Sequence, residues 1–186
     1  SLIYLPFKIN KTKIFCLSMQ RTGTTSTGDF LAQNGFRVFR CKDSYRNKFS
    51  YKWSQNKYNS IFNSIELMSN DAFEDDPWWM PSFFKRIYNK FPNAKFILFI
   101  RDSDKWYNSM VNHSKGMTLG NTYVHCRAYR RLDELYQKID DDPNFLPSEY
   151  ERDNKLTVEN MRDHYVKLYD KHNKEVVDFF KKKSPE

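Results

Sequence analysis

Short apolar segments alternate along this chain with longer segments in which apolar residues recur at helical spacing, and no other feature constrains the fold as strongly. The segments 13–18, 36–40 and 71–75 are typical of β-strands, and so is 95–100, the most hydrophobic of them. Strands that alternate with helices in this way form a mainly parallel sheet covered by helices. The sequence therefore predicts an α/β fold with three layers, α/β/α, in which segment 95–100 (KFILFI) is a central strand buried on both faces.

The segments between the strands carry apolar stripes that predict helices. The helix after the first strand should end at Gly35, and Asp102 or Ser103 can cap a later one. The polar, basic and aromatic segment 41–57 is interpreted as a loop, or as a lid over an acceptor substrate. The length suits one domain, residues 1–186. The predicted helices cover residues 24–34, 58–68, 79–91, 103–111, 124–139 and 161–179.

The composition excludes several classes of protein. Aromatic residues make up 17% of the chain, which is too many for a disordered protein. No apolar stretch approaches the roughly 20 residues that a membrane-spanning helix needs. The three cysteines are scattered and the four histidines lack metal-binding spacing, so we expect no disulfide framework and no metal site. The net charge of +8 is typical of a chain that binds anions, although a basic surface also simply keeps a protein soluble.

The turn after the first strand has the composition of an anion-binding site. Gly23 lets the backbone approach a ligand closely, and the start of the following helix offers unpaired N–H groups and a positive dipole end. Arg21 adds a full positive charge. These groups can hold a phosphate or a similar oxyanion; the alternative is a capped turn with an arginine on the surface. Hydroxyl donors are supplied by Thr24, Thr25 and Ser26.

This turn is not a Walker A loop. That loop requires G-x-x-x-x-G-K-[ST], in which the Lys reaches the phosphates and the hydroxyl holds Mg²⁺. The turn contains no Gly-Lys pair, and its cation, Arg21, precedes Gly23. ATP and magnesium are therefore disfavoured as ligands.

Two motifs resemble those of the sulfotransferases that use 3′-phosphoadenosine 5′-phosphosulfate (PAPS). Segment 21–26 (RTGTTS) is similar to the family's 5′-phosphosulfate loop, [KR]-x-G-T-[ST]-[STW], which follows the first strand. Arg101 and Ser109 are similar to its 3′-phosphate pair, an Arg that ends a later strand and a Ser eight residues further on. The segment DAFEDDPWW resembles the branch in which D-x-PW precedes a K-F-I-L-x-x-R-D strand. The resemblance covers residues 12–113, and more weakly the helix LYDKHNKEVVDFF.

The resemblance implies a P-loop-like sulfotransferase fold and a transfer of the sulfuryl group from PAPS to a hydroxyl or amine, which leaves adenosine 3′,5′-bisphosphate (PAP). It implies that Arg21 stabilises the leaving phosphate oxygen, at a position where the family often has Lys. It also implies that Asp75 is the base that takes the acceptor's proton, with Asp76 and Glu74 as second choices. The implied donor-binding residues are Arg21, Thr22, Gly23, Thr24, Thr25, Ser26, Arg101 and Ser109, with no metal.

Several of these residues also have a purely structural interpretation. The carboxylates of residues 74–76 follow a strand, where crowding raises the pKa of one of them, but they can equally form an acidic helix start before Pro77. Arg101 can pair with Asp102 or Asp104 instead of a phosphate. Family members usually continue with a further strand and helix, which we expect this chain to lack.

The sequence leaves three hypotheses about function. The first is a PAPS-dependent sulfotransferase whose acceptor is a small molecule or a saccharide. The second is a P-loop-like nucleotide kinase or phosphotransferase, which the missing Gly-Lys pair opposes. The third is a non-catalytic module of the same fold that binds polyanions, which steep salt dependence would indicate. We expect no nucleic-acid partner and no membrane span, and a location in the cytoplasm or, for a catalytic domain without its anchor, in a lumen.

Overall fold

The computed structural model of this chain describes residues 12–113, 122–141 and 156–183, and the rest of the expected domain of residues 1–186 lies outside the described part. The chain divides into two compact units. The first unit runs up to Leu17 and includes Gly23–Leu98, and the second consists of Ser18–Thr22 together with the chain from Phe99 onward. The expectation of a single domain stays a prediction.

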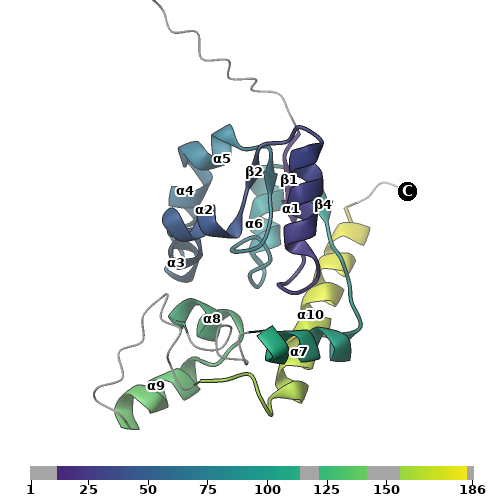
Figure 1. Ribbon diagram of the computed structural model, residues 1–186. Helices are drawn as coiled ribbons and strands as arrows, with labels where there is room; N and C mark the ends of the chain where they lie inside the picture. Colours follow the sequence, from purple (N-terminus) through teal and green to yellow (C-terminus); the bar gives the residue numbers. More distant parts are fainter. Residues whose placement is uncertain (1–11, 114–121, 142–155, 184–186) are drawn as a thin grey trace, which may run out of the picture. The chain divides into compact units, whose positions relative to one another are not determined.

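The first unit contains a parallel sheet (Figure 1). Phe15 pairs with Phe73 on one side and with Phe96 on the other, and all three strand pairings are parallel. The predicted α/β fold with a mainly parallel sheet is therefore confirmed. The strands are β1 (Ile14–Cys16), β2 (Val38–Phe39), β3 (Ala72–Phe73) and β4 (Lys95–Ile97), and they lie in the order β2-β3-β1-β4.

The helices of the first unit agree with the prediction after β1 and differ from it after β2. Helix α1 begins directly after Gly23, and Gly35 follows its end with a φ of 81°. The expectation of a loop over 41–57 is wrong, because α2 and α3 occupy most of it. The reason is burial: Phe49 and Trp53, one helical turn apart, belong to the core. The role of this segment as an acceptor lid stays a prediction. The helices are α1 (Thr24–Gln33), α2 (Cys41–Arg46), α3 (Phe49–Ser54), α4 (Tyr58–Phe62), α5 (Ile65–Ser69) and α6 (Phe83–Lys90).

The core of the first unit is built around one tryptophan. Trp78 is fully buried, and its ring centroid lies 4.9 Å from that of Phe73 and 5.2 Å from that of Phe15. Such aromatic pairs contribute about 0.5–1.5 kcal/mol each beyond the burial of their area. Because Asp75 precedes Trp78 by only three residues, this packing anchors the chain at the carboxylates that follow β3. Three further rings contact Trp78, those of Phe39, Phe49 and Phe83.

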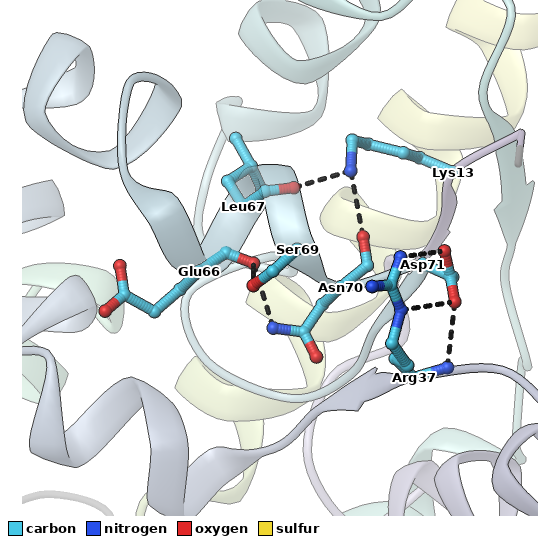
Figure 2. Close-up of polar contacts among 7 residues, drawn as sticks. All are labelled: Lys13, Arg37, Glu66, Leu67, Ser69, Asn70 and Asp71. Atoms are coloured by element: carbon cyan, nitrogen blue, oxygen red, sulfur yellow. Dashed lines mark hydrogen bonds and ion pairs between the residues drawn. The ribbon is translucent and has the colours of Figure 1, made fainter. Parts of the chain in front are cut away.

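A polar cluster joins the starts of β1, β2 and β3 (Figure 2). The buried carboxylate of Asp71 accepts hydrogen bonds from the backbone N–H of Arg37 at 3.0 Å and from its Nε and Nη2 at 3.1 and 3.0 Å. Lys13 donates to the backbone carbonyls of Leu67 and Asn70 at the end of α5, and burial holds its pKa below the usual range. These contacts stabilise the fold at the amino ends of the strands, whereas ligands of parallel sheets bind beyond the carboxyl ends.

Segment 95–100 differs from its prediction as a central strand. Strand β4 ends at Ile97 and lies at the edge of the sheet that the structure describes. Phe99 and Ile100 are 48% and 60% exposed. The backbone N–H of Phe99 donates to the side-chain oxygen of Ser18 at 2.7 Å, which is not a strand pairing. High hydrophobicity therefore did not place this segment in the middle of the sheet.

The second unit is helical. Asp102 caps α7 as predicted, because its side chain accepts the N–H of Lys105 at 2.9 Å. The predicted helix over 124–139 is interrupted, since Arg130 adopts a left-handed φ of 56°. Its helices are α7 (Ser103–Asn112), α8 (Tyr123–Ala128), α9 (Leu132–Asp141) and α10 (Arg162–Lys181). None of the helices in the described part of the chain is long and apolar enough to cross a membrane.

Candidate functional site

Three residues that the sequence assigns to donor binding come together in the second unit. The Nε of Arg21 donates to the side-chain oxygen of Ser109 at 3.2 Å. The Nη1 of Arg101 donates to the backbone carbonyl of Arg21, also at 3.2 Å. Both arginine side chains are exposed, and each guanidinium carries five N–H donors, so donors are left over for an anion. Two cationic residues and one hydroxyl residue, 80 and 88 positions apart in the chain, are therefore brought together by these hydrogen bonds.

The backbone of Arg101 is fixed by a tyrosine of α10. Its N–H donates to the hydroxyl of Tyr169 at 2.8 Å, and the ring of Tyr169 stacks on Trp106 with centroids 4.3 Å apart. The alternative pairing with a neighbouring acid is not observed: among the described residues, Arg101 forms no ion pair with a carboxylate. Asp104 instead pairs with Arg162, and Asp102 caps α7. The guanidinium of Arg101 is thus not neutralised by its neighbours in sequence.

The start of α1, in the first unit, has the geometry expected of an anion cradle. Gly23 occupies the N-cap position with a φ of 97°, a conformation that glycine adopts without strain. No side chain caps this helix end. The backbone N–H groups of the first turn therefore have no acceptor within the helix. The side chains of Thr25 and Ser26, in the same turn, are exposed. The hydroxyl of Thr22, in the second unit, is already used, since it donates to the carbonyl of Met19 at 2.6 Å.

The hydroxyl of Thr24 faces a carboxylate. Thr24 is buried and its Oγ1 donates to Oδ2 of Asp75 at 3.3 Å. The other oxygen of Asp75 accepts the backbone N–H of Asp76 at 2.9 Å, and the residue adopts a left-handed φ of 66°. The sequence assigned Thr24 to binding of the sulfuryl donor and Asp75 to taking the proton of the acceptor substrate. A hydrogen bond joins the two side chains within the first unit.

The three consecutive carboxylates have different environments. Asp76 is buried and its Oδ1 accepts the indole N–H of Trp79 at 2.6 Å. Glu74 is 3% exposed, and its Oε2 has no hydrogen-bond partner among the described residues. Asp75 is the one of the three that is partly exposed. A base must reach its substrate, so exposure favours Asp75.

Desolvation by the surrounding protein raises the pKa values of two of these carboxyl groups, although part of the surface of Asp75 stays exposed. The pKa of Asp75 lies well above its usual value of 3.8, first because of desolvation and then because of the negative charges of Asp76 and Glu74. Desolvation likewise raises the pKa of Glu74, although the positive charge of Arg40 opposes this shift. The next helix, α6, begins only at Phe83. The carboxylates are therefore not the acidic start of a helix, and a base with a raised pKa is the chemistry that they support.

A comparison with protein families agrees with this geometry. A family model described as "Sulfotransferase domain" matches residues 13–184. This chain belongs to the sulfotransferase domain family. The match includes both units, so the two cationic residues and the carboxylates all lie within it. A comparison with curated proteins finds no match.

Other residues of this sulfotransferase domain were assigned no role from the sequence. The hydroxyl of Tyr129 donates to the side chain of Gln20, the indole of Trp106 donates to the backbone carbonyl of Gln20, and Tyr169 accepts the backbone N–H of Arg101. Their partners lie 68 to 109 positions away, and a side chain that acts at such a distance leaves no local pattern. His125 had no expected partner, and in the structure it contacts Gln20. Sequence position next to Arg21 was the one signal that could have drawn attention to Gln20.

Arg131 is a structural residue in this sulfotransferase domain. It is 3% exposed, and it donates to the carboxylate of Glu134, the carbonyl of Thr157 and the hydroxyl of Tyr165. In the described part of the chain, no three His, Cys, Asp or Glu side chains are grouped as a metal site would require.

Proposed function

We propose that this chain transfers the sulfuryl group of PAPS to a hydroxyl or amine group by in-line displacement. The family establishes a sulfotransferase. The observation that supports the finer assignment is the pair of hydrogen bonds that join Arg101, Arg21 and Ser109 in the second unit. The acceptor is proposed to be a small molecule or a saccharide.

The proposed donor contacts follow from the chemistry of the residues. Arg101 and Ser109 are assigned to the 3′-phosphate, because a guanidinium fork matches phosphate geometry and a hydroxyl adds one donor. The loop 22–26, with the N–H groups at the start of α1, is assigned to the 5′-phosphosulfate. Exposed cations in the second unit suit a phosphate, and uncapped N–H groups in the first unit suit an oxyanion, so each set of residues fits one anionic group of this ligand.

The donor supplies an activated sulfuryl group, and the protein's part is to orient it and to move one proton. Asp75 accepts the proton of the acceptor's hydroxyl or amine as the oxygen or nitrogen forms its bond to sulfur. The bond between sulfur and the bridging phosphate oxygen breaks, and that oxygen takes the electron pair. Arg21 stabilises the resulting negative charge. The products are the sulfonated acceptor and PAP, with the proton held on Asp75.

A binding experiment tests this proposal. PAP should raise the melting temperature of the protein without magnesium, since a ligand that binds only the folded state stabilises it. The Arg101→Ala variant should lose most of this shift. Arg162→Ala is the matched control, because it also removes an exposed arginine from the second unit but keeps the cationic group. An absent shift at millimolar PAP, or a shift that requires magnesium, would refute the proposal.

A further inference from the structure

Gln20 is the buried neighbour of Arg21, and three hydrogen bonds fix it. Its side-chain Oε1 accepts the hydroxyl of Tyr129 at 2.8 Å, and its Nε2 lies 3.1 Å from Nε2 of His125. Its backbone carbonyl accepts the indole N–H of Trp106 at 2.8 Å. Both the side chain and the backbone of Gln20 are therefore held by hydrogen bonds. The residue is 8% exposed and lies in the short segment Ser18–Thr22.

The groups that hold Gln20 are themselves fixed. Nδ1 of His125 lies 2.8 Å from the hydroxyl of Thr122, the residue that caps α8 by accepting the backbone N–H of His125 at 3.1 Å. One arrangement of protons satisfies the whole chain of contacts: the Tyr129 hydroxyl donates to the Gln20 oxygen, the Gln20 amide donates to Nε2 of His125, and Nδ1–H donates to Thr122. The side chain of Gln20 thus connects Arg21 to the capped start of α8.

Tyr129 is fixed from a different direction. Its backbone carbonyl lies 2.7 Å from Nε2 of His164, and its ring packs 4.9 Å from that of Tyr165. Both contacts come from α10, so this helix fixes the residue whose hydroxyl donates to Gln20. Helices α7, α8 and α10 together determine where residue 20 lies.

Arg21 needs this support because its backbone is unusual. It adopts a left-handed φ of 67°, which is sparsely populated for residues other than glycine and persists where neighbours fix it. The carbonyls of residues 20 and 21 both accept side-chain donors, from Trp106 and Arg101 respectively. We propose that Gln20, clamped by Tyr129 and His125, is a positioning residue that holds Arg21 in the conformation that binds the donor's phosphate. This inference rests on the proposed function.

Two tyrosine variants separate an effect on the contacts of Gln20 from a general effect on the stability of the fold. Tyr129→Phe removes the hydroxyl that donates to Gln20 and keeps the ring. Tyr107→Phe is the matched control: its buried hydroxyl donates to the carbonyl of Val158 at 2.7 Å and accepts the N–H of Met161 at 3.1 Å, in the same unit. Gln20→Met repeats the perturbation from the other side, in case Tyr129→Phe does not fold.

Two readouts are measured on each variant. The first is hydrogen–deuterium exchange of the backbone amides of residues 19–24 without ligand, which reports on the clamp. The second is the dissociation constant of PAP without magnesium, which reports on the role of the clamp in binding. Tyr129→Phe and Gln20→Met should accelerate exchange in this segment and weaken PAP binding about 10-fold, the effect of roughly one lost hydrogen bond. Tyr107→Phe should change neither.

Each other outcome overturns a defined statement. Unchanged exchange in both test variants would overturn the clamp, whatever happens to PAP binding. Faster exchange with unchanged PAP affinity would overturn the positioning role. If the wild-type protein does not bind PAP, the proposed function fails, and the role of Gln20 in donor binding fails with it, although the exchange data would still report whether the clamp exists.

Discussion

Replacing Asp75 with asparagine should slow catalysis strongly while leaving the fold intact. The left-handed backbone at this position, with its φ of 66°, suits asparagine as well as aspartate. The amide oxygen can still accept the N–H of Asp76, and the amide nitrogen can donate to Thr24 in place of the present hydrogen bond. Both observed contacts of the side chain are therefore kept, and only its ability to take a proton is lost.

The size of the loss follows from the role of a general base. Proton transfer by a positioned side chain accelerates reactions about 10²- to 10⁴-fold, which corresponds to about 3–5 kcal/mol of the barrier. The neighbours cannot easily compensate, because Asp76 is held by the indole of Trp79 and Glu74 is buried. We therefore expect Asp75→Asn to lower kcat at least about 100-fold and to leave the affinity for PAP within about 2-fold of the wild type.

The same substitution should raise stability in a pH-dependent way. The folded state holds the proton of Asp75 more tightly than the unfolded state, because burial first, and then the charges of Asp76 and Glu74, raise its pKa above 3.8. For an acid with a raised pKa, wild-type stability falls as pH rises from the unfolded value through the folded one. Asp75→Asn removes this loss. Its advantage in melting temperature should be absent well below pH 3.8 and should grow above it.

The assay combines steady-state turnover with thermal unfolding across pH. Wild-type kcat/KM should fall on the acidic side at a pH above the usual carboxyl range, because the base must be ionised to work. Turnover by Asp75→Asn within about 5-fold of the wild type, together with an unchanged acidic limb, would show that another group is the base.

Three further substitutions test other parts of the account. Arg21→Lys should retain turnover within about 10-fold, since it keeps the charge, whereas Arg21→Ala should lower kcat by about 100-fold or more; equal losses would remove Arg21 from charge stabilisation. Gly28→Ala places a Cβ 3.1 Å from Cγ of buried Glu74 and 3.3 Å from Nη1 of Arg40. Overpacking should cost about 1–3 kcal/mol, which exceeds the gain of about 1 kcal/mol in helix propensity. Denaturant unfolding should therefore show a lower free energy of unfolding for Gly28→Ala, and no such loss for Gln33→Ala at an exposed position of the same helix. Asp71→Asn breaks the fork to Arg37 and should cost about 1–3 kcal/mol by denaturant unfolding, while Asp178→Asn, at an exposed pair with Lys174, should leave the midpoint unchanged.

The parts of the site that the sequence predicted are those with a local pattern. The turn before α1 combines a glycine, hydroxyl residues and a cation within a few positions, and in the structure its glycine occupies the N-cap position with a φ of 97°. Arg101 and Ser109 were identified through their resemblance to the family's 3′-phosphate pair, which follows a later strand. The structure adds the hydrogen bonds that join these residues, which depend on distances no spacing rule contains.

The predictions that were wrong concern segments whose structure depends on residues far away in the chain. Segment 41–57 appeared to be a polar loop, yet two of its aromatic residues, Phe49 and Trp53, are buried and make it helical. Segment 95–100 is apolar enough for a central strand, but strand order in a sheet is fixed by pairing, and β4 lies at the described edge. The hydrogen bond between Tyr129 and Gln20 spans 109 positions, so no local pattern in the sequence could predict it.

The affinity for PAP relative to adenosine 5′-monophosphate tests the central claim most directly, because the two ligands differ by the 3′-phosphate assigned to Arg101. Calorimetry without magnesium should show that the wild type prefers PAP by about 10- to 100-fold, as expected for charge-assisted hydrogen bonds. Arg101→Ala should reduce this preference to near one, while Arg162→Ala retains it. Equal wild-type affinities for the two nucleotides, or a preference that survives in Arg101→Ala, would contradict the account.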